Sequence, residues 1–167
     1  MRFVSPVQLT SRMRAPGKLA AFDVGTKAIG VSLSDDARTM AFPATTFQRG
    51  KDEVLLSREI EGFLDEKKVK GVVVGVPLLD GKATEMAHDI VQLMLRLDVA
   101  PLWMPNSDKR FPLHFTLWSE VNTTVNARRL ITAATTKRKV YKRSKDEIAA
   151  TLILKRFMWH MSRKKVQ

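Results

Sequence analysis

The sequence predicts an α/β domain in which a central mixed sheet of about five strands is flanked by helices. Two apolar runs, residues 19–24 and 71–75, have the length and composition of strands that are buried on both faces. Elsewhere the apolar residues recur at helical spacing, and the predicted order is three strands, helix, strand, helix, strand and then helices. The length of 167 residues suits one domain with a single substantial core.

The strands and helices can be placed along the chain from local patterns. After residues 19–24, Gly25 and Thr26 turn the chain, and residues 29–33 are expected to return as a second strand. Residues 39–47 predict a third strand, in which Pro43 marks an edge position or a bulge. Residues 51–68 and 83–97 predict helices, and residues 113–118 predict the last strand. The helical residues expected to face the core are Val54, Leu55, Ile60, Phe63, Leu64, Met86, Ile90, Leu93, Met94 and Leu97.

The C-terminal part of the chain is expected to be less regular before it ends in a helix. Residues 123–132 predict a short helix, and residues 135–145 resemble a flexible cationic loop. The final helix is expected to open at the capping-box pattern of residues 144–147. We divide the chain into a basic extension (1–17), a domain (18–160) with a loop insertion near 98–111, and a basic tail (161–167).

Charge is distributed unevenly and indicates a nucleic-acid partner. The chain has 29 Lys and Arg against 17 Asp and Glu, a net charge of +12. Residues 1–100 contain 14 basic and 13 acidic side chains, whereas residues 101–167 contain 15 basic and only 4 acidic ones. Such asymmetry favours a phosphate-binding surface, with a merely solvated basic face as the alternative. The expected contacts are Lys27, Arg128, Arg129, Lys137, Arg138, Lys139, Lys142, Arg143 and Lys145.

Other features of composition exclude several classes of site and leave the location open. Cysteine is absent, which excludes disulfides, thiolate zinc sites and thiol nucleophiles. No apolar stretch approaches the roughly 20 residues of a membrane span, so we expect no membrane partner. Residues 1–17 carry arginines and no acid, as an organellar transit segment or a basic arm would. This favours a mitochondrial or other organellar location, with the cytoplasm as the alternative.

Asp23 is the most informative single residue, because it lies inside the first buried run. A carboxylate in such a strand costs several kcal/mol unless it is paired or protonated. A bound cation is the main functional reason to keep one there. Three structural alternatives remain: Asp23 lies at the exposed end of the strand, pairs with a lysine, or caps the following turn.

Two further acids occur at matching places in the predicted topology. Glu120 follows the last strand, and Asp146 lies at the expected start of the final helix. Strand ends and helix starts meet at one edge of an open α/β sheet. Clustered carboxylates suit Mg²⁺ or Mn²⁺, so two-metal phosphodiester hydrolysis is a coherent hypothesis. Alternatively, Asp146 only complements the helix macrodipole in the first turn.

Four blocks of sequence together resemble a known family. They are Ala-Phe-Asp-Val-Gly-Thr-Lys at 21–27 with Ile-Gly-Val at 29–31, Val-Val-Val-Gly-Val-Pro at 72–77 with Asp-Gly at 80–81, Glu120 with Thr-Thr at 123–124, and Asp146 with Ala-Ala at 149–150. Over residues 18–158 this pattern is similar to the YqgF/RuvX family, described as Holliday junction resolvases or pre-16S ribosomal RNA nucleases. The resemblance implies a ribonuclease H-like fold, with Asp23, Glu120 and Asp146 as catalytic, metal-binding acids for two Mg²⁺ or Mn²⁺ ions.

The chain also departs from that family pattern at two places. Ala28 and Val121 stand where the family usually has arginine, and Ser119 stands where it has a further acid. Alanine and valine cannot replace the bidentate phosphate contacts of arginine. These departures imply that other residues bind the substrate, or that turnover is weak or lost.

Three hypotheses about function follow. The first is a metal-dependent nuclease acting on structured RNA or DNA, with a ribosomal RNA precursor ahead of branched DNA. The second is a non-catalytic RNA-binding or assembly protein of an organellar ribosomal particle, contacting ribosomal or assembly-factor proteins through the apolar residues 102–104. The third, a fragment of an actin-like sugar kinase or chaperone ATPase, would need far more chain.

Overall fold

The sheet at the centre of the molecule has six strands in the order β1-β8-β5-β2-β3-β4. The computed structural model describes residues 2–13, 16–50, 52–80, 82–97, 113–119 and 138–164. The strands are β1 (Arg2–Phe3), β2 (Lys18–Val24), β3 (Ala28–Ser34), β4 (Ala41–Gln48), β5 (Val69–Val76) and β8 (His114–Ser119), with a separate hairpin of β6 (Leu78–Leu79) and β7 (Lys82–Ala83). The helices are α1 (Pro6–Arg12), α2 (Glu53–Glu66), α3 (Glu85–Arg96) and α5 (Arg138–Lys164).

Strand directions confirm the predicted mixed sheet. β2, β3 and β4 pair antiparallel in sequence order, whereas β5 is parallel to β2 and β8 is parallel to β5. The register between β3 and β4 shifts next to Ser32, the partner of Pro43, and β4 is an edge strand, as the proline predicted. The domain therefore has the ribonuclease H-like α/β fold expected from the sequence, with the two-residue β1 as an additional edge strand.

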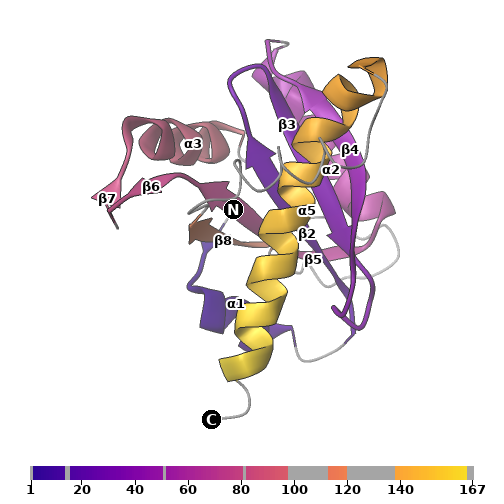
Figure 1. Ribbon diagram of the computed structural model, residues 1–167, viewed down its shortest axis with the longest axis vertical. Coiled ribbons are helices and arrows are strands. Elements are labelled where there is room, and N and C mark those ends of the chain that lie inside the picture. The colour runs from indigo at the N-terminus through magenta and orange to yellow at the C-terminus, as the bar shows by residue number, and fades with distance from the viewer. Residues whose placement is uncertain are drawn as a thin grey trace.

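Two apolar layers lie on opposite faces of this sheet, because successive strand residues point to opposite sides. Ala20, Phe22 and Val24 of β2 pack in one core with the buried residues of α2 and α3. Leu19 and Ala21 pack in a second core with α1 and α5. Figure 1 shows α5 crossing the near face of the sheet while α2 lies behind it.

The helices of the first layer begin at polar capping residues, and their buried residues differ in part from the predicted ones. The Asp52 carboxylate accepts a hydrogen bond from the Val54 N–H, and Thr84 caps α3 in the same way. The residues buried from these helices are Leu56, Ile60, Leu64, Ala87, Ile90, Leu93 and Met94. The prediction was wrong for Val54, Leu55 and Met86, which are exposed.

The N-terminal segment is packed onto the sheet. Ser5 and Gln8 form a capping box at the start of α1, and Leu9 in this helix is fully buried. β1 pairs with β8 at the edge of the sheet, and Leu9 and Met13 pack in the same core as α5, so residues 2–13, set apart above as an extension, pack against the domain. At the other terminus, Met161 is buried, and residues 161–164 of the predicted tail continue α5.

The final helix begins earlier than predicted. α5 starts at Arg138, so the capping-box interpretation of residues 144–147 was wrong, and residues 138–145 are helical rather than a loop. Lysine and arginine are good helix formers, which accounts for the longer helix. The predicted helix at 123–132 and the insertion at 98–111, with its apolar residues 102–104, lie outside the described residues. None of the helices described here is long and apolar enough to cross a membrane.

Candidate active site

Asp23 is the next-to-last residue of β2 and lies on the face covered by α5, since it alternates with Leu19 and Ala21. Its side chain is partly buried. Its neighbour across the antiparallel pair with β3 is Gly30. On this face of the sheet, the residue next to the Asp23 carboxylate is therefore a glycine, which has no side chain.

The space beside Gly30 is filled by the backbone of α5. A Cβ atom built on Gly30 would lie 2.2 Å from the carbonyl oxygen of Asp146 and 2.8 Å from its Cβ atom. Only glycine permits so close an approach. Because Gly30 and Asp23 are paired, this contact brings Asp146 of α5 next to Asp23 of β2. The structure thus brings together two of the three predicted acids, which are 123 positions apart in the sequence.

The electrostatic surroundings of Asp23 disfavour its charge. Burial, followed by the nearby Asp146 carboxylate, raises the pKa of Asp23 from 3.8 to about 6, while Lys145 opposes this shift. Of the alternatives considered for Asp23, pairing with a lysine is thus partly met by Lys145. No hydrogen bond from the following turn to the Asp23 carboxylate occurs among the described residues. A partly buried carboxylate beside a second carboxylate fits a site for a cation.

Asp146 has no helix-capping role. It lies eight residues after Arg138, the first residue of α5, and the first turn of this helix contains no acid. The macrodipole explanation applies only within the first turn, so it does not apply here. The adjacent Glu147 has a structural partner instead, because its Oε1 atom accepts a hydrogen bond from Thr46 Oγ1 of β4 (3.1 Å).

The chemistry of the two acids fits a hard divalent cation. Carboxylate oxygens are the ligands that Mg²⁺ and Mn²⁺ prefer, usually one or two from the protein with water and substrate phosphate completing the shell. Within the part of the chain that the structure describes, no group of three His, Cys, Asp or Glu side chains is close enough to hold a metal. The third predicted ligand, Glu120, directly follows Ser119 in the sequence and lies outside the described residues.

The predicted nucleic-acid contacts are only partly covered by the structure. Lys27 is exposed in the turn between β2 and β3, and Lys145 lies close enough to Asp23 to affect its pKa. Arg128, Arg129 and Lys137 lie outside the described residues, as do the side chains of Arg138, Lys139, Lys142 and Arg143.

Arg49 is a cation near this site that sequence analysis did not select. Its guanidinium donates to the Gly25 carbonyl oxygen, and its backbone N–H donates to the Lys27 carbonyl oxygen (2.8 Å). It therefore lies against the turn that follows β2, two residues beyond Asp23. Arg49 reaches this turn because the preceding residue, Gln48, pairs with Ala28 of β3. The local sequence contains no signal for such a contact. Gly30 was likewise noted only as part of a motif.

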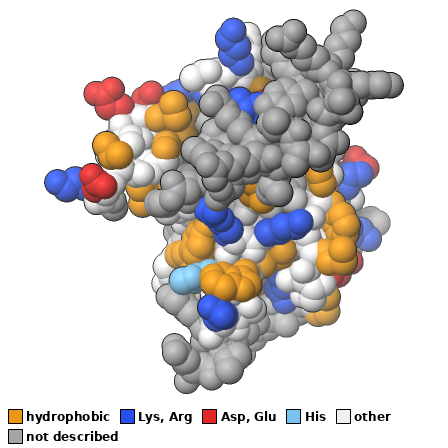
Figure 2. All heavy atoms as spheres, in the orientation of Figure 1, with side chains coloured by type: hydrophobic (Ala, Val, Ile, Leu, Met, Phe, Trp, Pro, Cys, Tyr) orange, Lys and Arg blue, Asp and Glu red, His pale blue; other side chains and the backbone are white. Residues whose placement is uncertain are grey.

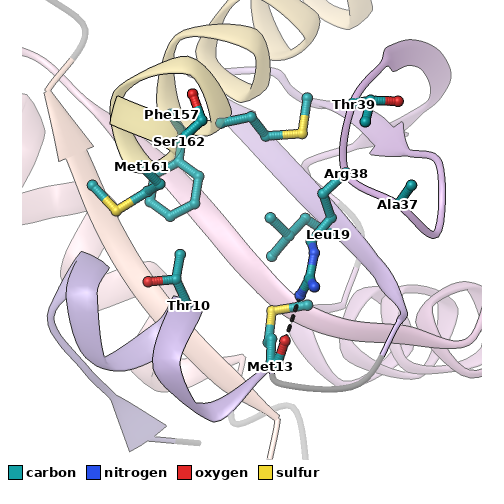
Figure 3. A pocket seen from close by; sticks show the side chains of 10 residues that line it. Thr10, Met13, Leu19, Ala37, Arg38, Thr39, Phe157, Met161 and Ser162 are labelled. Atoms are coloured by element: carbon teal, nitrogen blue, oxygen red, sulfur yellow. Dashed lines mark hydrogen bonds between the residues drawn. The ribbon is translucent and has the colours of Figure 1, made fainter. Parts of the chain in front are cut away.

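A separate pocket of about 270 Å³ lies near the other end of α5. Its walls are largely apolar, with Leu19, Phe157 and Met161 among them, and Arg38 extends across it to donate to the Met13 carbonyl oxygen (2.8 Å; Figure 3). None of the described residues that line it is acidic. This pocket lies between α1, α5 and the turn between β3 and β4, and it is distinct from the site at Asp23.

Comparison with known proteins agrees with the resemblance seen in the sequence. Residues 17–160 match the family model described as "RuvX: Holliday junction resolvase". A Rhodobacter capsulatus protein named "Putative pre-16S rRNA nuclease" is 33% identical over 139 residues, covering 83% of this chain and 80% of that protein. A Zymomonas mobilis protein of the same name is also 33% identical, over 83% and 78% of the two chains.

Among solved structures, Thermus thermophilus RuvC aligns over 87% of this chain and 96% of its own, with 12% identity and a TM-score of 0.48. The family assignment depends on the sequence matches, which cover most of the chain; the range matched by the family model spans the positions of Asp23, Glu120 and Asp146. The chain belongs to the RuvX family.

Proposed function

We propose that this protein is a metal-dependent endonuclease that cleaves structured RNA during the maturation of ribosomal RNA. One observation carries the proposal: Gly30 lets the α5 backbone lie against β3, so that Asp146 is placed beside the partly buried Asp23. The names of the relatives, pre-16S rRNA nucleases, support this choice of substrate.

Asp23, Asp146 and Glu120 would hold the cations. Along β8, His114, Thr116 and Trp118 alternate onto the α5 face, where Thr116 pairs with Val73 of the α5 core. Continuing this alternation leads us to expect Glu120 on the same face as Asp23. Bound Mg²⁺ or Mn²⁺ would supply a nucleophilic hydroxide and compensate charge on the leaving oxygen.

The protein's own side chains would prepare the site for that chemistry. Asp23 has to be ionised to act as a ligand, and the positive charge of Lys145 favours the ionised form. Lys27 and Arg49, at the turn after Asp23, would contact phosphates next to the scissile bond. The lysines and arginines of residues 128–143 would add contacts along the nucleic-acid backbone.

A second candidate function is supported by Ala28. This residue starts β3 beside the proposed site, where the family resemblance calls for arginine. A chain without that guanidinium could bind RNA in an organellar ribosomal particle without cleaving it. The family model's description also makes a four-way DNA junction an alternative substrate.

The test is a cleavage assay with an end-labelled pre-16S rRNA fragment and a four-way DNA junction, each in Mn²⁺ and in EDTA. We expect RNA cleavage only with Mn²⁺, reduced at least ~100-fold in Asp23→Asn and Asp146→Asn, because a charged group at the reacting centre is lost. Asp89→Asn, an exposed acid on α3, is the matched control and should keep full activity. RNA binding without cleavage in any metal would favour the binding protein, and cleavage of the junction alone would favour the resolvase.

A further inference from the structure

The outer side of α5 carries a second candidate interface, in the half of the helix that follows Asp146. Lys155, Trp159 and Arg163 recur every four residues and therefore share one side of the helix. All three are exposed, and Trp159 is 59% accessible. We call these three residues the α5 stripe. Figure 2 shows basic, hydrophobic and histidine side chains gathered on the surface over this part of α5.

The indole of Trp159 is in contact with a neighbouring cation. The guanidinium carbon of Arg163 lies 4.3 Å from the centroid of the Trp159 ring, a cation–π contact on one face of the indole. This contact covers one face of the ring, and the rest of the indole is exposed at the surface. An exposed aromatic ring beside cations is the arrangement on which an unpaired nucleic-acid base stacks while its phosphates are neutralised.

Charge along this half of the helix is of one sign. From Ile148 to the C-terminus the sequence contains Lys155, Arg156, Arg163, Lys164 and Lys165 and no acid. Trp159 is also the only large hydrophobic residue exposed among the described side chains of α5. An isolated indole among lysines and arginines differs from the broad apolar face of a membrane-binding helix and from the lysine-poor core of a protein interface.

Aromatic contacts link this part of α5 to β8. The ring of His160 lies 5.2 Å from that of Trp118 on β8, and Trp118 packs edge-on against Phe157 (5.3 Å). Trp118 is two residues before Glu120, the third proposed metal ligand. The rise of α5 separates Trp159 from Asp146 by ~20 Å along the helix axis, so a strand of several nucleotides could reach from one to the other.

We propose that the α5 stripe binds single-stranded nucleic acid flanking the cleavage site, with a base stacked on the free face of Trp159 and phosphates on Lys155 and Arg163. The inference deepens the proposed function, since the bound strand would be part of the same substrate. Binding needs no metal and no cleavage, so it can be measured separately. A duplex hides the faces of its bases and would gain nothing from Trp159.

The experiment measures fluorescence anisotropy of labelled single strands, RNA in one arm and DNA in the other, with the full chain in EDTA. Trp159→Ala should weaken binding by about 5- to 100-fold, the range for loss of one base stack, whereas Trp159→Phe should retain most of it. Lys155→Gln and Arg163→Gln should each lower the slope of log K against log salt by about 0.7. Binding of an RNA duplex should be unaffected by Trp159→Ala.

Matched controls separate this site from the candidate active site. Lys82→Gln on β7 removes an exposed cation, and Leu95→Ala on α3 removes an exposed apolar side chain; neither should change binding. Asp23→Asn should lose cleavage but keep this binding, which separates failure of the hydrolase proposal from failure of this one. Equal single-strand affinities for wild type and Trp159→Ala would overturn the inference. So would a change in self-association of Trp159→Ala, measured by sedimentation, without a change in RNA affinity, because the stripe would then be a protein interface.

Discussion

The two faces of the sheet differ in the polarity of their side chains. On the face covered by α2 and α3, the buried side chains of β2, β3 and β5 are all apolar. On the face covered by α5, the same three strands carry Leu19, Ala21 and Val73 but also Asp23, Gly30 and Ser32. Within one seven-residue strand, β2, alternate residues serve two different environments.

Several buried polar groups on the α5 face reduce the stability of the folded protein. The hydroxyl oxygens of Ser32 and Thr116 are buried without a hydrogen-bond partner among the described residues, and the pKa of Asp23 is raised by burial. A buried polar group without a partner is destabilising. The face covered by α2 and α3 therefore contributes apolar packing. The face covered by α5 contains destabilising buried polar groups near the candidate site. Such local conflicts are typical of functional positions.

The largest effect is expected from filling the space at Gly30. Gly30→Ala would place a methyl group on the backbone of Asp146, so we expect at least ~3 kcal/mol of destabilisation and displacement of α5 from the site. Gly62→Ala, on the other face, is the matched control: nothing lies within 4 Å of its added Cβ, and it should stabilise α2 by ~0.5–1 kcal/mol. Urea unfolding measures both, and equal stabilities would show that α5 does not lie against β3 as described.

A smaller effect should appear in the pH dependence of stability. Because the folded pKa of Asp23 is about 6 and its unfolded value is 3.8, the native state binds more protons than the unfolded chain between these values. The free energy of unfolding contributed by Asp23 therefore falls as pH rises from about 4 to 6, by at most ~3 kcal/mol, and is level above that. Urea unfolding in EDTA from pH 4 to 7 should show this fall in wild type relative to Asp23→Asn. Parallel curves would mean that Asp23 is not desolvated in the folded state.

The smallest effect concerns the buried hydroxyl groups of the α5 face. Thr116→Val keeps the shape and removes a buried oxygen that lacks a partner, so the change should be neutral or stabilise the protein by up to ~1 kcal/mol. On the opposite face, the reverse change Val74→Thr should destabilise by ~1–3 kcal/mol, since it buries a new hydroxyl in an apolar core. Thermal unfolding of the pair tests whether the two faces differ in this way.

Local patterns in the sequence were sufficient for most of the fold. Buried runs predicted β2 and β5, and Pro43 predicted the bulged edge strand, because these features depend on neighbouring residues. The start of α5 was missed because Ser144 and Glu147 match a capping box whether or not the helix has already begun. Asp23 and Asp146 were chosen as site residues from pattern and family resemblance. Their proximity depends on the missing side chain of Gly30 and on the packing of α5, which are tertiary features that local spacing does not encode.

The most direct test of the account is thermal unfolding with Mn²⁺ or with EDTA, because its central claim is that Asp23 and Asp146 form a cation site. At Mn²⁺ about a hundredfold above Kd, wild type should gain ~3 kcal/mol, a rise in Tm of roughly 5–10 °C. Asp23→Asn and Asp146→Asn should lose that gain, and in EDTA Asp23→Asn should be at least as stable as wild type, since a desolvated anion has been removed. Asp89→Asn should respond as wild type does. An equal Mn²⁺ response in wild type and Asp23→Asn, or none in either, would contradict the claim.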